Sequence, residues 1–402
     1  MSRSAIPVRG GVRWTRYVGA WLAISSSPGA LVLGAQLAGS YGRLSALWLA
    51  LGALLMAVLL LAQGRLGLLP PRGHGQTFAE LSRGYLPPAA RTAVGLLIAA
   101  GMVGWVGFSV GIGGESLARV TGAPAAVCAL GLGVLVVVLA NLDVRRWNVV
   151  AVGTTVITLV LVPLLLLGVD RAEAPVTVSG VDGAQAVVVL AAFVGYVAVF
   201  MLRSPDFTAG IVRPSGLLIC VAALILPALM LVLVGASLQL SGDSSTGASL
   251  AGVPGIRMAG LPVGDLLIVL AVLAPGVTSA FSGGLALQVF TGARPKVATS
   301  VIAGVGLVLG VLQFHRDLVD WLALLAGVGP PIGVPFWVEA ARRRRGHRAR
   351  LVPTWIWLPP AVAGAALIAA GVRAAPLLSL AAAGLLAGAW GLRDRGVVQG
   401  GE

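Results

Sequence analysis

The residues best placed to do chemistry stand in the middle of the first long apolar run. The stretch "ISSSPGALVLG" (24–34) puts three serines, 25 to 27, directly before Pro28 and Gly29. Proline removes a backbone donor and glycine loosens a helix, so nearby carbonyls and amides lose helical partners. Inside a membrane, such groups are tolerated only where they line a cavity or contact a ligand. The stretch therefore predicts either a binding site or a proline kink in which the serines bond back to carbonyls.

Catalytic chemistry has weaker support. A membrane-embedded enzyme needs His, Asp, Glu or Cys side chains that converge on one point. The histidines and the carboxylates nearest the apolar runs stand in connecting segments or at the ends of runs, and the two cysteines read as packed thiols. These residues are His74, His315, His347, Glu115, Asp265, Asp320, Glu339, Cys128 and Cys220. We expect no enzyme, no cofactor and no metal apart from a coupling cation.

The elements that position the serines are membrane spans. Of 402 residues, 58% are hydrophobic and 10% are charged, and the mean hydropathy is +0.97. Soluble domains carry about 25% charged residues, and about 20 apolar residues cross a bilayer as a helix. The sequence predicts an all-α polytopic membrane protein of about twelve transmembrane helices. They lie near 17–38, 43–63, 92–118, 123–141, 147–169, 184–202, 216–239, 264–289, 297–314, 318–339, 353–371 and 374–392.

The basic residues predict the orientation. If the N-terminus is cytoplasmic and the spans alternate, 22 of the 28 lysines and arginines fall on the cytoplasmic side, as the positive-inside rule requires. The net charge of +14 is therefore a topology signal, and no nucleic-acid partner is expected. We expect a multi-pass protein of the cell membrane with both termini cytoplasmic. Its partners are the lipid bilayer and a small molecule; the sequence leaves the oligomeric state open, and a monomer is compatible with it.

The span directions predict an internal repeat. Spans one to five begin inside and spans six to ten begin outside, so the two sets are inverted relative to each other. Inverted repeats with helices broken at matching positions recur in transporters. We expect one transmembrane domain over 1–402. Its parts are a first five-helix repeat at about 17–169, an inverted second repeat at about 184–339 and two extra helices at about 353–392.

The sixth span has features of a matching break. In "AAFVGYVAVFMLRSPDFT" (191–208), Gly195 and Tyr196 stand near mid-span, and a Ser-Pro-Asp turn follows at 204–206. We therefore expect helices 1 and 6 to be broken at mid-membrane. This pairing favours a binding site over a simple kink at the serines of the first span.

Four motifs, in their order along the chain, resemble those of the nucleobase–cation symporters. They are "ISSSPGALVLGAQLA" in span 1, "GMVGWVGFSVGIGGESLA" in span 3, "RSPDFTAGIVRP" after span 6 and "LLAGVGPPIGVPFW" in span 10. This family contains the purine and cytosine permeases and relatives that carry allantoin, hydantoins and hydroxymethylpyrimidine. The resemblance covers spans 1 to 10. It implies the leucine-transporter fold, a five-plus-five inverted repeat, with two extra C-terminal helices.

The resemblance also implies a substrate site between spans 1, 3, 6 and 8, where a flat heterocycle stacks on aromatic side chains and is hydrogen-bonded by amides and hydroxyls. Trp105, in "GWVG", is the implied stacking residue. Tryptophan normally lies at membrane interfaces, so its place well inside a span needs a reason, and helix packing is the alternative one. The implied substrate-binding residues are Ser25, Ser26, Ser27, Gly29, Trp105, Gly195, Tyr196, Thr278 and Ser279.

The chain departs from the family at several of these positions. Met102 stands where the family often has a glutamine, and Val197 where it often has an aromatic residue. Thr278 and Ser279 replace the neighbouring asparagines of cytosine permeases. Hydroxyls still donate and accept hydrogen bonds, but they discriminate less than amides. We expect a less polar pocket, which makes cytosine itself a weaker candidate.

The coupling cation stays open between Na⁺ and H⁺. In sodium-dependent members of the family, carbonyls at the span 1 break and a Ser/Thr pair in span 8 hold the ion, and that pair aligns here with Pro275 and Gly276. Hard cations need several oxygen ligands. A proton would favour a mid-membrane carboxylate or histidine, and the sequence places none there. The candidate cation-binding residues are Ala23, Ser26, Thr278 and Ser279.

Four residues are candidates for a gate or a hinge: Pro28, Asp206, Pro330 and Pro331. Asp206 either caps a short amphipathic helix predicted at 75–87 or pairs with a basic loop as an inner gate. The two prolines of span 10 either let the outer half of that helix swing or make a static kink.

The leading hypothesis is a secondary-active, cation-coupled permease that imports a small planar heterocycle by alternating access. The heterocycle would be of the cytosine, purine or hydroxymethylpyrimidine type. One alternative is a carrier of amino acids or other small solutes with the same fold, in which a carboxylate meets the positive helix end at the span 1 break. The other is a non-transporting paralogue or sensor.

Overall fold

The computed structural model describes residues 11–25, 27–142, 153, 156–157, 160, 174–178, 183–241, 257–258 and 261–392. Ser26, most of the expected fifth span and both ends of the chain lie outside the described residues. Within them, eight helices are long and apolar enough to cross a membrane, and three shorter apolar helices occupy 125–140, 295–311 and 354–369. The predicted all-helical polytopic fold is confirmed, and every expected span except the fifth has its helix.

The apolar helices form two groups with a third set alongside. One group holds α1 (Val18–Ser25), α2 (Pro28–Tyr41), α3 (Ala46–Gly64), α8 (Gly183–Arg203) and α9 (Pro214–Ser241). The other holds α5 (Pro88–Thr121), α6 (Ala125–Ala140), α10 (Val263–Ala271), α11 (Leu273–Thr291) and α12 (Pro295–Val311). In the first group α2 packs against α9 and α3 against α8, whereas in the second α5 packs against α11 and α12. The remaining helices, which pack on α8 and on one another, are α13 (Leu318–Arg344), α14 (Thr354–Ala369) and α15 (Ala375–Leu392).

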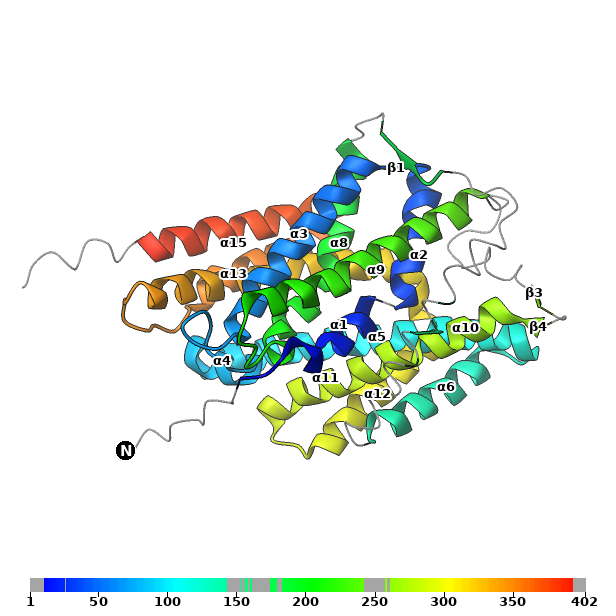
Figure 1. Cartoon of the computed structure of the whole chain (residues 1–402), viewed down its shortest axis with the longest axis horizontal. Coiled ribbons are helices and arrows are strands. Elements are labelled where there is room, and N and C mark those ends of the chain that lie inside the picture. The colour runs from blue at the N-terminus through cyan, green and yellow to red at the C-terminus, as the bar shows by residue number, and fades with distance from the viewer. Residues whose placement is uncertain are drawn as a thin grey trace, which may run out of the picture.

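Short elements mark the two ends of the bundle. Figure 1 shows α4 (Phe78–Tyr85) at one end and the small strands at the other. We call the first the inner end, because the sequence assigns α4 to the cytoplasm, and the second the outer end. The inner end also has the 3₁₀ turns η1 (Trp14–Arg16), η2 (Arg65–Gly67) and η3 (Ser204–Phe207). The outer end has η5 (Phe314–Asp317), β1 (Leu44–Ser45) paired in parallel with β2 (Val176–Thr177), and β3 (Arg257–Met258) paired antiparallel with β4 (Leu261–Pro262).

The break predicted in the first span is present. Helix α1 ends at Ser25 and α2 begins at Pro28, with Ser27 in an extended conformation as its N-cap. The Ser27 hydroxyl accepts a hydrogen bond from the Gly29 backbone N–H at 3.2 Å. Proline suits the first helical position because that residue has no intrahelical donor to lose. The short polar motif therefore ends one helix and starts the next inside the apolar bundle.

The break predicted at the middle of the sixth span is wrong. Helix α8 runs without interruption through Gly195 and Tyr196 and gives way to η3 only at Ser204. The reason lies in packing. A methyl group at Gly195 would overlap the backbone carbonyl of Leu322 on α13, so this glycine lets two helices approach closely. The eighth span, in contrast, is divided between α10 and α11. Pro275 cannot donate a hydrogen bond to the carbonyl of Ala271, where α10 ends.

Helix α4 is held at the inner end by polar and aromatic contacts. Thr77 and Glu80 form a capping box at its N-terminus. Tyr85, at its C-terminus, stacks on Phe336 of α13 with ring centroids 5.0 Å apart, and its hydroxyl lies 2.8 Å from Nε2 of His74. Burial lowers the pKa of His74, with a further contribution from Arg343, and burial raises the pKa of Tyr85 to about 12. Neutral His74 therefore accepts the Tyr85 hydroxyl proton.

This contact predicts a pH-dependent stability. Because His74 has a lowered pKa in the folded state, the unfolded chain binds more protons once the pH falls below about 6.5. The folded state should therefore lose stability between pH 7 and pH 5.5. A thermal-melting series should show a shallower loss in His74→Gln, whose amide still accepts from Tyr85. His347→Gln, in the loop before α14, should keep the wild-type slope; equal slopes in all three proteins would contradict the assignment.

Candidate functional site

The break between α1 and α2 faces a small central cavity. The cavity lies between this break, the middle of α5, the second half of α8 with η3, and the first half of α11, so elements of both helix groups enclose it. Its lining is aromatic and hydroxylic, and none of the described residues that line it is charged. They are Ile24, Ser27, Met102, Trp105, Tyr196, Phe200, Phe207, Pro275, Thr278, Ser279 and Ser282.

Trp105 forms the centre of the aromatic wall. Its ring is edge-to-face with Tyr196 at 5.6 Å and with Phe108 at 5.9 Å between centroids. The Gly29 Cα lies so close that a methyl group there would be 3.2 Å from Trp105 Cζ3. Edge-to-face neighbours fix the plane of an indole ring. The cavity therefore offers an oriented aromatic surface beside the helix break.

Hydroxyl groups supply the polar part of the cavity. Ser27 accepts from Gly29 N–H, so its own proton remains to be donated. Thr278 donates to the Ala274 carbonyl at 2.7 Å, and Tyr196 donates to the Ile24 carbonyl at 2.8 Å, so both oxygens can still accept. Ser282 is buried, and its hydroxyl has no partner among the described residues. The site thus presents both donors and acceptors, and all of them are neutral.

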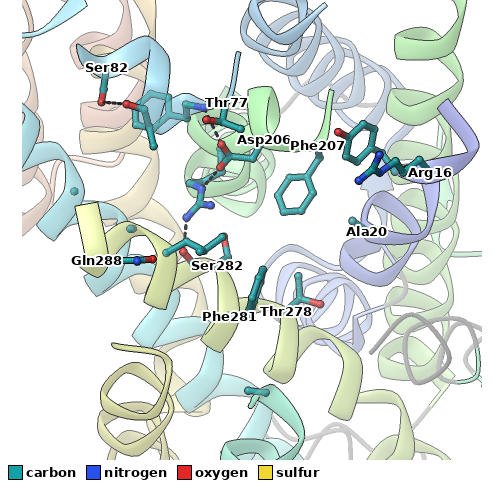
Figure 2. A pocket seen from close by; sticks show the side chains of 18 of the residues that line it. Arg16, Ala20, Thr77, Ser82, Asp206, Phe207, Thr278, Phe281, Ser282 and Gln288 are labelled. Atoms are coloured by element: carbon teal, nitrogen blue, oxygen red, sulfur yellow. Dashed lines mark hydrogen bonds and ion pairs between the residues drawn. The ribbon is translucent and has the colours of Figure 1, made fainter. Parts of the chain in front are cut away.

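A larger inner cavity of about 660 Å³ continues from the central one, in which about 30 Å³ is open. Phe207, Thr278 and Ser282 line both. Figure 2 shows these three side chains around one hollow, with Arg16 at its edge. Arg16 is exposed, so the hollow reaches solvent at the inner end. The central cavity is therefore accessible from this end.

Solved transporters match the structure over nearly its whole length. Mhp1, a nucleobase-cation-symport-1 family transporter, matches in its closed conformation with bromovinylhydantoin bound (TM-score 0.66, 17% identity, 96% of each chain). Inward-facing Mhp1 gives a TM-score of 0.68 at 16% identity, over 97% of this chain and 95% of that one. A Na⁺-coupled sialic acid symporter, substrate-bound and outward-open, gives 0.63 at 12% identity, over 95% and 90%. The Eremococcus coleocola manganese transporter gives 0.58 at 13% identity, over 98% and 99%.

The chain has the leucine-transporter fold. No family model matches the sequence, and no curated protein does either. At these identities the likeness establishes the fold alone, and the matched proteins are transporters of chemically different solutes. Within the leucine-transporter fold, the substrate of this chain has to be argued from its own side chains.

The structure brings together most, not all, of the residues that the sequence singles out. Ser27, Gly29, Trp105, Tyr196, Thr278 and Ser279 line the central cavity or touch its wall. Ser25 lies elsewhere, because its hydroxyl donates to the Leu22 carbonyl at 2.8 Å within its own helix turn. Gly195 faces α13, and Ser26 lies outside the described residues.

Three lining residues were not singled out from the sequence. Phe200 stands one helical turn after Tyr196, and Ser282 one turn after Thr278, so helical spacing could have placed both on the same faces. Phe207 follows Asp206 directly in the motif after span 6. It stacks on Phe200 with ring centroids 5.2 Å apart. Together they extend the aromatic wall toward the inner cavity.

The candidate gate residues have different surroundings. Asp206 accepts from Phe78 N–H at 2.7 Å, so it binds the N-terminal backbone of α4, and it also pairs with Arg203. Arg203 in turn donates to the Ser282 carbonyl on α11, which connects the two helix groups beside the inner cavity (Figure 2). Pro330 and Pro331 are buried inside an uninterrupted α13. Pro28 starts α2.

The candidate cation ligands lie at the same helix break. Ala23 packs against Ala274 of α11, one turn before Thr278. The Thr278 hydroxyl bonds back to the Ala274 carbonyl, and its lone pairs remain available. The described residues include no group of three His, Cys, Asp or Glu side chains that could hold a metal ion. A cation here would therefore depend on carbonyl and hydroxyl oxygens, as the sequence predicts.

Proposed function

We propose that the protein is a secondary-active permease of the nucleobase–cation symporter family. It imports a small, planar, uncharged heterocycle across the cell membrane by alternating access, with both termini cytoplasmic. The observation that carries this proposal is the central cavity itself. The cavity joins an oriented indole ring, Trp105, to neutral hydroxyl donors and acceptors, and none of its described lining residues is charged. A planar ring can stack on the indole while its edge exchanges hydrogen bonds with the hydroxyls.

The geometry of the helix break favours a heterocycle over an amino acid. An amino-acid carboxylate would need backbone N–H groups at the start of α2. Pro28 has none, Gly29 N–H donates to the Ser27 hydroxyl, and Ala30 N–H donates to the Ser27 carbonyl at 3.1 Å. A carboxylate would have to displace these bonds, whereas a neutral ring leaves them intact.

Alternating access assigns a role to the two cavities. With the sequence-predicted orientation, the inner cavity opens to the cytoplasm, so the described conformation is one that releases substrate inward. Movement of α1, α2, α8 and α9 against the second helix group would close this cavity and open the outer end. The Arg203 bond to the Ser282 carbonyl crosses between these groups, so this bond would have to rearrange.

Ligand-induced thermal stabilisation of the purified protein tests the proposal. The panel contains purines, cytosine, hydroxymethylpyrimidine, hydantoins and amino acids, each with and without Na⁺ and across pH. We expect one class of neutral ring compound to raise the melting temperature by mass action, and the Na⁺ or pH dependence then identifies the coupling cation. Stabilisation by amino acids alone would overturn the heterocycle assignment. Silence of the whole panel, together with no uptake in vesicles, would favour a non-transporting relative.

A further inference from the structure

A second cavity, of about 540 Å³, lies at the outer end and shares no lining residue with the central or inner cavities. Its walls come from the C-terminal part of α2, the start of α8, the first turns of α13 and the turn between α14 and α15. It therefore lies outside the substrate route described above. Its size is comparable to that of the inner cavity.

The cavity presents one acid and one base that do not pair. Asp320, in the first turn of α13, and Arg373, in the turn before α15, both line it and are exposed. Neither forms an ion pair within the part of the chain that the structure describes. Other charges at this end do pair, since Arg119 lies 2.8 Å from Asp265 and His315 lies 2.7 Å from Glu115. The separation of Asp320 and Arg373 across a cavity is therefore a specific arrangement.

Both charges are held in place by hydrogen-bonded backbone. Asp320 is part of the α13 helix. Arg373 follows a tight turn in which Gly371 N–H donates to the Ile368 carbonyl at 2.9 Å and Val372 N–H to the Leu367 carbonyl at 2.9 Å. Gly371 has φ of 79°, which favours glycine. Neither backbone can easily move to let the two side chains meet.

The third wall adds an unsatisfied polar group to an apolar floor. Gln36 of α2 lines the cavity, and its side-chain oxygen is buried without a partner among the described residues. Leu37, Ala191 and Ala323 supply apolar surface. An unpartnered buried acceptor is costly, so a ligand that brings a donor to this wall would be stabilising.

We propose that the outer cavity binds a small zwitterion, with an ammonium group at Asp320 and a carboxylate or phosphate at Arg373. A pure anion would be repelled by Asp320, and a pure cation by Arg373, whereas a zwitterion satisfies both. Two sources carry this chemistry: a free amino acid, and the headgroup of an aminophospholipid in the outer leaflet.

Occupation of this cavity is coupled to the central site through α2 and α8. Gln36 lies nine residues after Ser27 on one continuous α2, about 13 Å along the helix axis. Ala192 lies one helical turn before Tyr196 on α8. A zwitterion that fixes these helices changes the free energy of moving them, so it should alter the affinity for the transported ring, and the reverse must hold by linkage.

The test measures binding of phosphoethanolamine and of glycine to the purified full-length protein by titration calorimetry. We expect saturable binding that weakens at least tenfold in Asp320→Asn and in Arg373→Gln. Two exposed outer residues that do not line the cavity provide matched controls, Asp317→Asn and Arg316→Gln, and should bind as the wild type does. Phosphocholine, whose quaternary ammonium has no N–H, and inorganic phosphate should bind more weakly than phosphoethanolamine.

Nanodiscs distinguish the two sources. If phosphatidylethanolamine discs, unlike phosphatidylglycerol discs, abolish glycine binding, the lipid headgroup is the ligand; if glycine binds equally in both, the ligand is a free solute. No binding of either probe, or equal loss in the Asp317 and Arg316 controls, overturns the proposal. Trp105→Ala should leave zwitterion binding unchanged, so failure at the central site and failure here are separable.

Discussion

Replacing Trp105 with alanine should abolish measurable ring-compound binding. Trp105 is the largest side chain in the central cavity wall, and Tyr196 and Phe108 fix its plane. Stacking of one base on one aromatic ring contributes about 1–3 kcal/mol, which is a loss of roughly tenfold to a hundredfold in affinity. Thermal stabilisation by the ring compound should disappear at concentrations that saturate the wild type, and uptake into vesicles should fall in parallel.

Two variants make the Trp105 experiment specific. Trp105→Phe keeps an aromatic face and should retain most of the binding. Trp355→Ala removes a tryptophan that is 46% exposed on α14, far along the chain from the cavity, and should bind as the wild type does. If Trp105→Ala binds the ring compound normally while melting at a lower temperature, Trp105 is a packing residue and the substrate assignment fails.

The sequence predicts the elements of this fold better than it predicts their breaks. Span number and helix type follow from the length of apolar runs, which depends on local composition alone. The break of the first span was also predictable, because three hydroxyl residues and a Pro-Gly pair leave backbone groups without helical partners. The matching break at Gly195 was not, since glycine has two uses in membrane helices and only the position of α13 reveals which one applies.

The candidate site shows the same limit. Trp105 and Thr278 could be assigned to the site because the resemblance supplied a motif and a span. Whether a hydroxyl faces the cavity or bonds back to its own helix is decided by rotamers, and Ser25 and Ser27 differ in this respect although they are two residues apart. The outer cavity was invisible to sequence reasoning, because Asp320 and Arg373 are brought to one cavity only by the packing of α13 with α14 and α15.

Replacing Gly195 with alanine should destabilise the protein severely. The added methyl group would overlap the Leu322 carbonyl, and the obstructing atom is backbone in the middle of α13, so no side-chain rotation can relieve the overlap. Helices α8 and α13 would have to separate along their contact. Overpacking of this kind costs about 3 kcal/mol. We expect a large fall in melting temperature or loss of folded protein on expression.

The Gly195 result also decides between two roles for this residue. If Gly195 served mainly to let a ring approach the helix, the alanine variant would melt normally and lose only ligand stabilisation. If it serves helix packing, stability falls with or without ligand. Gly131→Ala on α6 is the matched control, since no atom lies within 4 Å of its added methyl group, and alanine is favoured over glycine in a helix by about 1 kcal/mol. A normal melting temperature in Gly195→Ala would mean that α8 and α13 do not pack as closely as described, and a break near Tyr196 would have to be reconsidered.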